Sequence, residues 1–486
     1  MASTNASVTP IVSGFHPDPT ICRVGGDYYL ATSSFEYFPG VPLFHSTDLV
    51  TWTQIGNVMT TREQFVEGAA RPSGGLWAGT LRHRDGLFYY ITTNVSDFDA
   101  GQIIVTASDP AGPWSEPVHV RGAIGIDPDI CWDDDGVCLV TWHRFNWKVG
   151  GIDVHQVAID PATGELLGES YPVWQGSGMP AAEGPHLYHI GDWWYLMFAE
   201  GGTEKGHSVT VARAPRPEGP YEGCPANPIL TRRSTFAPVV HTGHADLVQT
   251  PEGDWAAVYL GVRPAGSTPG YHVLGRESFL SGIDWVDGWP VFVTDRYEIP
   301  TTDPGFAEDF TGGAAAWHPR WVVPAGDLSE IDLSDGAARV PAGRALCVRV
   351  TDLTWEAEAE LSGSFELRID ARHSYRLEVE GDRVRAVRTV GGFSQIVASH
   401  EVAGATERVS VRISAVPSQE RTVPLGDAGP DEILLAVRDG DAWTELARLD
   451  GRYVSTEVAS GFTGRVLAVG DASSDTLLRT MTYRGR

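Results

Sequence analysis

The chain has 486 residues, about three times the commonest size of a single domain, and its hydrophobic fraction of 42% is enough to fill more than one core. Lys and Arg number 36 against 63 Asp and Glu, and the resulting net charge of −27 repels phosphate backbones and anionic lipid, so we expect neither nucleic acid nor a membrane as a partner. The high content of turn and aromatic residues (55 Gly, 32 Pro and 16 Trp) predicts an all-β protein.

The N-terminus and the cysteines indicate the compartment. The first ten residues contain neither a basic cluster nor an apolar stretch of the kind found in secretory signals, which predicts a cytoplasmic protein. The cysteines are odd in number and contain no Cys-x-x-Cys pair, which argues against a disulfide framework and a zinc site. They are Cys22, Cys131, Cys138, Cys224 and Cys347.

A repeated turn-and-strand pattern organises the first 300 residues. Each copy begins at a glycine and continues as an aromatic or aliphatic strand, as in Gly26-Asp-Tyr-Tyr-Leu-Ala-Thr. The five glycines are 60, 50, 55 and 62 residues apart: Gly26, Gly86, Gly136, Gly191 and Gly253. Three to four short strands in about 55 residues make one propeller blade. In a β-sandwich, the regular spacing of these turns would be a coincidence. We therefore predict a five-bladed β-propeller over residues 8–300.

Ionisable residues recur at one phase of this repeat. Counting back eight or nine residues from each glycine reaches Asp18, Ala78, Asp127, Glu183 and His244. The innermost strand of every blade lines the channel of a propeller, so these positions converge on its axis. A carboxyl group on an inner strand is costly unless it is paired or hydrated. The pattern predicts a shared polar pocket.

Converging carboxylates have two chemical uses. They bind a hard cation such as Ca²⁺, or they act as acid and base on either side of a glycosidic bond. Asp18 lies between two prolines that hold its backbone rigid, as a base needs, and the longer side chain of Glu183 can reach a leaving-group oxygen. Asp127 is the third carboxyl group and would raise the pKa of the acid by like-charge repulsion.

We expect that hydrolysis of a glycosidic bond by this acid and base requires no cofactor. His244 with channel waters leaves room for a structural Ca²⁺ in the propeller channel, and an activity and melting temperature insensitive to EDTA would argue against that ion.

Aromatic and basic side chains beside the same strands complete a sugar site. Aromatic faces can stack on sugar rings, although the same residues can also pack between blades. These aromatics are Phe35, Tyr37, Phe38, Trp77 and Trp142. Arg276 can pair with a channel carboxylate or a sugar hydroxyl, or form a surface ion pair.

Residues 306–486 lose the blade rhythm and form a second domain. Alternating stretches such as Phe365-Glu-Leu-Arg-Ile-Asp predict half-buried antiparallel strands, and ten to twelve of them suit a β-sandwich. Carbohydrate binding, a wall of the pocket and structural support all remain open as its role.

Several motifs of residues 8–300 resemble glycoside hydrolase family 43, in its β-xylosidase and α-L-arabinofuranosidase branch. They are Phe15-His-Pro-Asp-Pro-Thr, Ser34-Phe-Glu-Tyr-Phe-Pro-Gly-Val-Pro, Glu183-Gly-Pro-His-Leu-Tyr, Gly243-His-Ala-Asp-Leu-Val and Leu274-Gly-Arg-Glu. The resemblance implies a five-bladed propeller, inverting hydrolysis, Asp18 as general base and Glu183 as general acid. It implies that Asp127 tunes and orients the acid.

The same resemblance implies that Phe35, Trp77, His244 and Arg276 bind substrate, and that the C-terminal domain is a lectin-like jelly roll. One motif departs from the family. Members often carry Trp-Ala-Pro-Asp in the second blade, whereas this chain has Trp77-Ala-Gly-Thr, which leaves the sugar preference open.

We therefore expect an inverting exo-acting glycoside hydrolase that releases pentose from xylan-derived or arabinoxylan oligosaccharides. A β-1,4-xylosidase is the leading interpretation, and an α-L-arabinofuranosidase using the same pocket is the alternative. A non-catalytic glycan-binding propeller is a third reading, although all three carboxylates are present. The expected partner is a small oligosaccharide, and the oligomeric state stays open.

Overall fold

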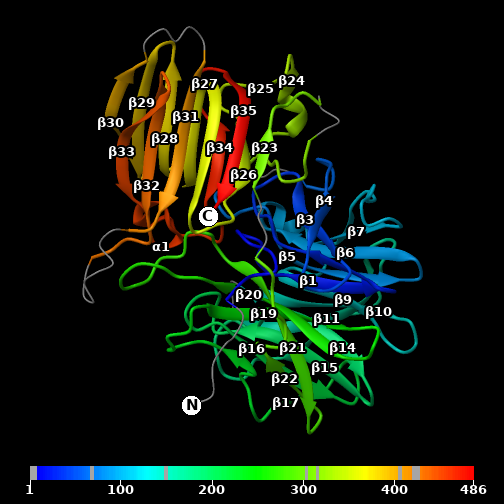
Figure 1. Ribbon diagram of the computed structural model, residues 1–486. Helices are drawn as coiled ribbons and strands as arrows, with labels where there is room; N and C mark the ends of the chain where they lie inside the picture. Colours follow the sequence, from blue (N-terminus) through cyan, green and yellow to red (C-terminus); the bar gives the residue numbers. More distant parts are fainter. Residues whose placement is uncertain are drawn as a thin grey trace. The chain divides into compact units, whose positions relative to one another are not determined.

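The computed structural model describes residues 8–65, 71–146, 151–301, 305–312, 317–402, 408–418 and 427–486, and the chain forms two compact units (Figure 1). The first unit comprises residues up to 12, 16–262 and 277–300, and the second comprises 13–15, 263–276 and 301–486. In Figure 1 the first unit runs from blue to green, and most of the second from yellow-green to red.

Five antiparallel sheets make up the first unit, each with four or five strands that follow one another closely in the chain. Blades 1 and 2 consist of β1 (Thr20–Val24), β2 (Asp27–Ala31), β3 (Gly40–Ser46), β4 (Thr53–Met59), β5 (Leu76–Arg84), β6 (Leu87–Asn94), the 3-10 helix η1 (Val95–Ala100), β7 (Gln102–Ala107) and β8 (Val118–Val120). Blade 3 consists of β9 (Ile126–Trp132), β10 (Cys138–Asn146), β11 (Gly151–Asp160), β12 (Glu165–Leu166) and β13 (Tyr171–Trp174). Blades 4 and 5 consist of β14 (Glu183–Ile190), β15 (Trp193–Glu200), β16 (Ser208–Ala214), β17 (Glu222–Gly223), β18 (Leu230–Thr231), β19 (Val240–Gln249), β20 (Trp255–Val262), β21 (Glu277–Val286) and β22 (Trp289–Val293).

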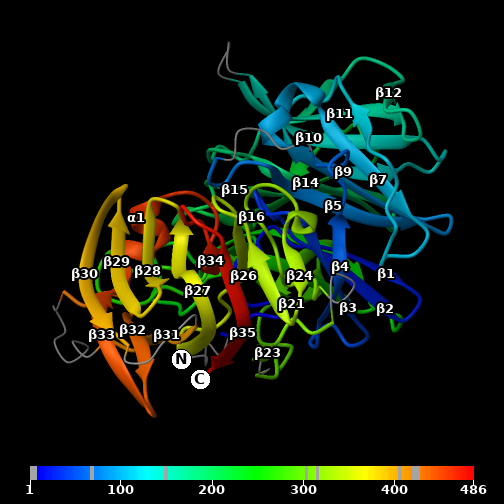
Figure 2. The ribbon, with the colours of Figure 1, turned by 90° about the horizontal axis from the view of Figure 1, so that it is seen from above.

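The innermost strands close a ring. β1, β5, β9, β14 and β19 each contact the next, and β19 contacts β1. Figure 2 shows β5, β9 and β14 side by side. The start of the chain fastens the closure, since the amide of Ile11 donates to the carbonyl of Ser278 in β21 at 2.9 Å. This arrangement confirms the predicted five-bladed propeller.

Apolar side chains between neighbouring blades form the core of the propeller. Met197 and Val209 of blade 4 pack against Ala257 and Phe279 of blade 5, and similar clusters join blades 5 and 1, 2 and 3, and 3 and 4. Burial of these side chains holds the blades together and leaves the inner strand of each blade to face the axis.

Thirteen strands lie in the described part of the second unit, against ten to twelve predicted. They are β23 (Phe306–Glu308), β24 (Asp332–Ser334), β25 (Ala337–Val340), β26 (Ala345–Arg349), β27 (Trp355–Asp370), β28 (His373–Glu380), β29 (Arg383–Val390), β30 (Phe393–Glu401), β31 (Val409–Val416), β32 (Glu432–Asp439), β33 (Ala442–Asp450), β34 (Val466–Gly470) and β35 (Thr476–Gly485). The short helices are η3 (Leu328–Glu330), η4 (Gly451–Val454) and α1 (Thr456–Ala459).

The long strand β27 links the two faces of this unit. Up to Ser362 it pairs with β35, with β31 on its other side, and from Gly363 onward it pairs with β28 and β34. The chain turns at Gly363, whose φ of 107° lies outside the range of ordinary strand residues. A sandwich whose two sheets share one long strand accounts for this pairing.

Segment 263–276 connects two strands of blade 5 yet belongs to the second unit. The amide of Arg465 donates to the carbonyl of Val273 at 2.9 Å, and His272 Nδ1 lies 2.5 Å from a carboxyl oxygen of Glu457. These contacts interrupt the contiguous 8–300 range expected for the propeller.

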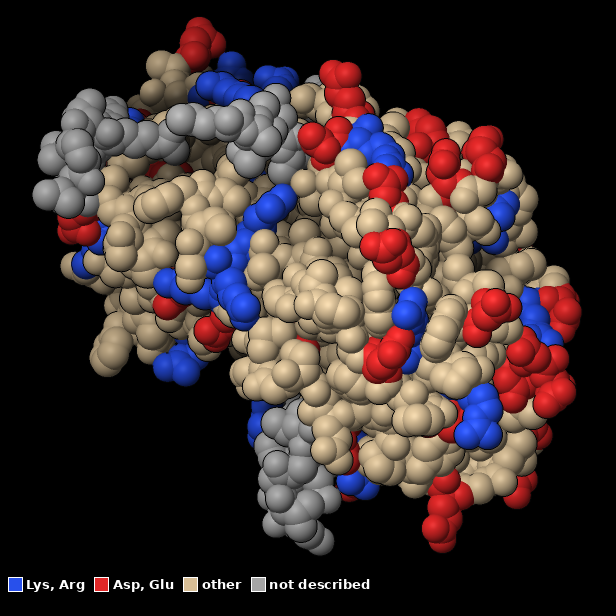
Figure 3. All heavy atoms as spheres, turned by 90° about the horizontal axis from the view of Figure 1, so that it is seen from below, with Lys and Arg blue, Asp and Glu red and all other residues tan. Residues whose placement is uncertain are grey.

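All five cysteines are buried free thiols, and burial raises the pKa of Cys22 to about 12. Among the described residues, no helix is both long and apolar enough to cross a membrane. On the face drawn in Figure 3, acidic and basic side chains are interspersed.

Candidate active site

The innermost strand of every blade carries the same irregularity. In β5, Leu76 pairs with Asn94 and Gly79 pairs with Thr92. The inner strand therefore has two residues between these pairs where its partner has one, which is one extra residue. The same extra residue occurs between Ile126 and Asp129, between Glu183 and His186, and between Gly243 and Asp246. Blade 1 has the same extra residue, because Thr20 pairs with Ala31 and the Ser33 amide donates to the Pro17 carbonyl. Such β-bulges redirect side chains and are frequent beside active sites.

The first residue of most of these bulges has a left-handed backbone. Its φ is 55° at Asp18, 54° at Asp127, 57° at Gly184 and 48° at His244. A non-glycine residue in this region costs on the order of 1–3 kcal/mol, and such strain gathers at functional sites. Three of these four equivalent positions hold a non-glycine ionisable residue, which marks this ring of bulges as the candidate site.

The register corrects the repeat phase expected from the glycines. Trp77 and Gly184, not Ala78 and Glu183, are equivalent to Asp18, so Glu183 lies one residue before its bulge. The counting failed because the β5–β6 hairpin is one residue pair longer than the β1–β2 hairpin. In addition, Gly191 is the first rather than the second residue of its turn.

Asp18 is held by its neighbours in blades 1 and 5. The residue is 5% exposed, and its carboxylate accepts a 2.6 Å hydrogen bond from the hydroxyl of Ser33. His244 Nδ1 lies 3.7 Å from the other carboxyl oxygen. These contacts give the carboxylate a defined orientation, as a general base requires.

Glu183 is half-buried at the start of β14, between two fixed groups. The carbonyl of the preceding Ala182 accepts a 2.5 Å hydrogen bond from Nδ1 of His143 in blade 3. The following Gly184 lies against the His244 ring, where a Cβ atom would come within 2.7 Å. The Glu183 backbone is thereby tied to blades 3 and 5.

Asp127 is 7% exposed, and its bulge is tied to blade 2. The hydroxyl of Thr80 donates to the carbonyl of Pro128 at 2.9 Å. Thr80 belongs to the Trp77-Ala-Gly-Thr motif, and a Cβ on Gly79 would meet the Ile91 carbonyl at 2.3 Å. In this chain, the motif that departs from the family pattern therefore links blade 2 to blade 3.

Among the five aromatics considered for sugar stacking, only Trp77 is half-buried rather than buried. The indole Nε1 of Trp77 donates to the Ser73 carbonyl at 2.9 Å. Phe35 is 1% exposed, and its backbone bridges to Leu76, next to Trp77. The remaining three are buried, as packing residues are: Tyr37, Phe38 and Trp142.

Arg276 belongs to the second unit, at the end of segment 263–276. It is 7% exposed, and its guanidinium carbon lies 5.5 Å from the centroid of the Phe462 ring. The geometry of the candidate site therefore rests on the six other predicted residues.

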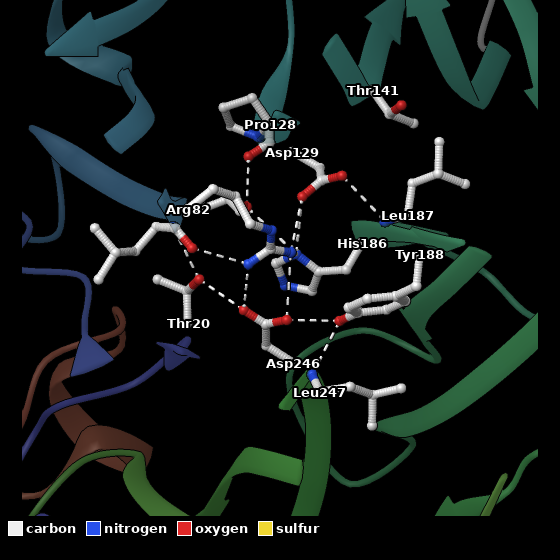
Figure 4. A network of polar contacts seen from close by, with 12 residues as sticks. Thr20, Arg82, Pro128, Asp129, Thr141, His186, Leu187, Tyr188, Asp246 and Leu247 are labelled. Carbon is white, nitrogen blue, oxygen red and sulfur yellow. Dashed lines mark hydrogen bonds and ion pairs between the residues drawn. The ribbon is translucent and has the colours of Figure 1, made fainter. Parts of the chain in front are cut away.

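A polar network joins the inner strands beside the bulges, and sequence reasoning missed it (Figure 4). We call it the inner-strand network; it consists of Thr20, Arg82, Asp129, His186, Tyr188 and Asp246. Arg82 reaches Asp246 Oδ2 at 2.9 Å and Asp129 Oδ1 at 3.0 Å. Asp246 also accepts hydrogen bonds from the hydroxyls of Thr20, at 2.7 Å, and Tyr188, at 2.6 Å.

The charges of the network stabilise one another. Burial opposes ionisation of Asp246, but Arg82 and then His186 outweigh it and hold the pKa of this carboxyl well below its usual range. Burial also opposes the charged form of Arg82, yet Asp246 and Asp129 raise the pKa of the guanidinium above its ordinary value. Arg82 and Asp246 are therefore both charged at neutral pH.

With this geometry in place, the comparisons with known proteins decide the family. The model for glycosyl hydrolases family 43 matches residues 8–290. The chain belongs to this family. The match covers the whole propeller up to β22 and agrees with the motifs that carried the resemblance.

Relatives and solved structures agree with this membership. A xylosidase/arabinosidase of Butyrivibrio fibrisolvens is 43% identical over 325 residues, 62% of this chain and 60% of the relative. A non-reducing-end α-L-arabinofuranosidase of Bacteroides ovatus is 44% identical over 285 residues, 58% of this chain and 52% of the relative. The chain thus spans little more than half of either relative.

The crystal structure of a xylan β-1,4-xylosidase from Bacillus halodurans C-125 matches with a TM-score of 0.85 at 27% identity, covering 98% of this chain and 99% of that chain. The likeness therefore extends through both units.

A sequence signal for the network existed. Four of its members follow a bulge residue by two positions, in Asp18-Pro-Thr20, Asp127-Pro-Asp129, Gly184-Pro-His186 and His244-Ala-Asp246. Regular pairing with the next strand resumes at this position, so a second polar residue at this spacing marks a second polar layer beside the bulges. Arg82 has no such signal, because its partners lie in other blades.

The donors present do not favour a calcium ion bound directly at these strands. No group of three His, Cys, Asp or Glu side chains in the described part of the chain could hold a metal ion. Asp129 and Asp246 are paired with Arg82, so a cation on them would have to displace the guanidinium. A Ca²⁺ held by His244 through water stays a prediction.

Asp246→Asn should lower the free energy of unfolding by about 3–5 kcal/mol at pH 7, because it leaves a buried guanidinium without one of its two carboxylates. The folded pKa of Asp246 lies below the unfolded value, so its contribution is complete above the unfolded value and declines as the pH falls toward the folded one. The difference between variant and wild type should therefore narrow below about pH 4.

Urea unfolding followed by tryptophan fluorescence measures this difference at pH 7 and at about pH 3.5 to 4. The lower pH lies near the usual Asp pKa of about 3.9. Asp284→Asn is the control, since Asp284 is 57% exposed and pairs with Arg296 at the surface, where about 1 kcal/mol or less is expected. Equal effects of the two substitutions would contradict the prediction.

Proposed function

We propose that this family 43 protein is an inverting exo-acting glycoside hydrolase that releases pentose from xylan-derived or arabinoxylan oligosaccharides, with β-1,4-xylosidase as the leading activity. The observation that carries the proposal is the ring of bulges, which presents Asp18 and Asp127 in the same left-handed conformation, with Glu183 beside the equivalent bulge of blade 4. Family membership gives these carboxyl groups a glycosidic bond as their target.

In the proposed mechanism, Asp18 removes a proton from a water molecule, which attacks the anomeric carbon from one face. Glu183 donates its proton to the departing oxygen on the other face. Inversion requires the two carboxyl groups to lie roughly 6.5–9.5 Å apart, because the water must fit between base and sugar. Asp127 favours the protonated form of the acid through like-charge repulsion and orients it.

The exposed side of Trp77 offers a surface for a sugar ring beside these carboxylates, and Phe35 supports it from the adjoining loop. His244 holds Asp18 and contacts the bulge of Glu183. Binding of a sugar hydroxyl by Arg276 stays a prediction from the family resemblance.

A second candidate is α-L-arabinofuranosidase activity in the same pocket. The names of the two relatives support it, since one is a xylosidase/arabinosidase and the other an α-L-arabinofuranosidase. A non-catalytic glycan-binding propeller is not favoured, because such a protein would need none of the three carboxylates.

Initial rates on 4-nitrophenyl β-D-xylopyranoside and 4-nitrophenyl α-L-arabinofuranoside rank the two activities. We expect a higher kcat/KM on the xyloside, with single xylose units released from xylotetraose. Proton NMR of the first product should show α-xylose, the inverted anomer. Initial formation of β-xylose would contradict inversion, and absence of release from every pentoside would contradict hydrolysis.

We further propose that the protein acts in the cytoplasm on small oligosaccharides. The five buried free thiols suit a reducing compartment. Cell fractionation with detection of the protein in the soluble intracellular fraction tests this location, and its recovery from the medium or the envelope would contradict it.

A further inference from the structure

The inner-strand network connects all five blades at one level of the propeller. Thr20 lies in blade 1, Arg82 in blade 2, Asp129 in blade 3, Tyr188 in blade 4 and Asp246 in blade 5. Backbone amides join it as well, since Ile21 and Leu187 donate to Asp246 and Asp129 at 2.9 and 3.0 Å. A change at its centre therefore reaches every inner strand.

The network is one step along the strand from the candidate site. Thr20, Asp129 and Asp246 each lie two positions after a bulge residue, at the point where regular pairing with the next strand resumes. In blade 4, the Leu187 amide that binds Asp129 lies four residues after Glu183. Displacement of these anchors would displace the bulges.

Arg82 is the cation that the two network aspartates share (Figure 4). Nη1 donates to Asp246 at 2.9 Å, and Nη2 donates to Asp129 at 3.0 Å and to the second carboxyl oxygen of Asp246 at 3.3 Å, which uses both ends of the planar guanidinium fork. Lysine has one terminal nitrogen and cannot reproduce this geometry. Without the guanidinium, two buried carboxylates from blades 3 and 5 would lose the cation that they share.

We propose that Arg82 is a positioning residue of the active site, which sets the spacing of the bulges that carry Asp18, Asp127 and His244 and of the adjoining Glu183. It acts through Asp129, Asp246 and Thr20 and not on the reacting atoms. The inference rests on the proposed function for its kinetic readout and on the geometry alone for its structural readout.

Arg82→Met should lower kcat on the preferred nitrophenyl pentoside by about 10²-fold, because a misplacement of about 1 Å between catalytic groups costs this much. KM should change far less than kcat, because the aromatic and polar groups proposed to bind the sugar are not removed. Arg82→Lys should recover part of the lost kcat, since it restores the charge but not the fork.

Arg213→Met is the matched control. Arg213 lies in the same unit, its side chain is 18% exposed against 16% for Arg82, and it also pairs with a carboxylate, Glu222. It lies in β16, and its guanidinium contacts the Gly288 carbonyl and the rings of Trp193 and Trp289, none of which belongs to an inner strand. We expect Arg213→Met to lower the melting temperature and to keep kcat within about twofold of wild type, whereas Arg82→Met should lower kcat by about 10²-fold.

Melting temperatures and steady-state kinetics of the three full-length variants test the proposal. A kcat within about twofold of wild type in folded Arg82→Met would overturn it, whatever the melting temperature. If Arg82→Met does not fold, Thr20→Val removes the hydrogen bond from Thr20 to Asp246 and the one that the Leu81 amide donates to Thr20. A loss of kcat in Thr20→Val beyond that of Arg213→Met supports the proposal, and an unchanged kcat overturns it.

A crystal structure of Arg82→Met or, if needed, Thr20→Val separates this inference from the proposed function. If wild type hydrolyses no pentoside, the proposed function fails, and the structure alone decides about Arg82. Displaced bulges at Asp18, Asp127 and His244 support the positioning role, and bulges that superpose on those of wild type overturn it.

Discussion

Asp18→Ala and Glu183→Ala are each expected to lower kcat on the preferred nitrophenyl pentoside by at least about 10²–10⁴-fold, to the limit of detection, while the protein stays folded. Asp18→Ala leaves the attacking water without a base, and Glu183→Ala leaves the departing oxygen without a proton donor. Steady-state kinetics together with circular dichroism and the melting temperature measure both effects.

The two roles can be told apart by the leaving group. A dinitrophenolate departs without protonation, so Glu183→Ala should recover much of its rate on a 2,4-dinitrophenyl pentoside, whereas Asp18→Ala should not. Glu222→Ala is a control, because Glu222 is an exposed carboxylate whose side chain is 58% accessible. Activity retained by either site variant on the nitrophenyl substrate would refute its assigned role.

Gly184→Ala is expected to lower kcat by about 10²-fold, although it changes no ionisable group. The new Cβ would lie 2.7 Å from the ring of His244, which itself lies beside Asp18, and the φ of 57° is unfavourable for alanine. The ring or the bulge must move, and either movement changes the position of Glu183 relative to Asp18.

Gly191→Ala separates this clash from backbone strain. Gly191 lies in the turn of the same hairpin, between β14 and β15. It has a φ of 63° and open space where its Cβ would lie. It should lose about 1–2 kcal/mol of stability with kcat unchanged. Thermal unfolding and kinetics of the two variants provide the comparison, and equal kcat values in both would show that the contact with His244 does not position the acid.

The fold could be predicted because its information is local and repeated. A glycine turn followed by an aromatic strand, as at Gly26 and Gly191, recurs at the spacing of one blade, and alternation in Phe365-Glu-Leu-Arg-Ile-Asp is visible within six residues. Asp18 and Asp127 were found for the same reason, since each lies eight or nine residues before a turn glycine of the repeat.

The aromatics show where this reasoning stops. Phe35 and Trp77 look alike in the sequence, but the side chain of Phe35 is buried and that of Trp77 is partly open. Burial depends on the elements that cover a residue, and Trp142 packs into the core between blades 2 and 3 for a reason its neighbours in the chain do not reveal.

The sequence by itself determined the propeller and the strand-rich second domain and proposed the carboxyl groups of the site, because hydrophobic period and turn chemistry are properties of a few consecutive residues. Only the tertiary structure decided the register of the bulges, which moved Glu183 one residue out of the expected phase. It also decided that Arg82 pairs with Asp129 and Asp246, residues 47 and 164 positions away in the chain. Contacts of that separation arise only when the ring of blades closes, so no local pattern records them.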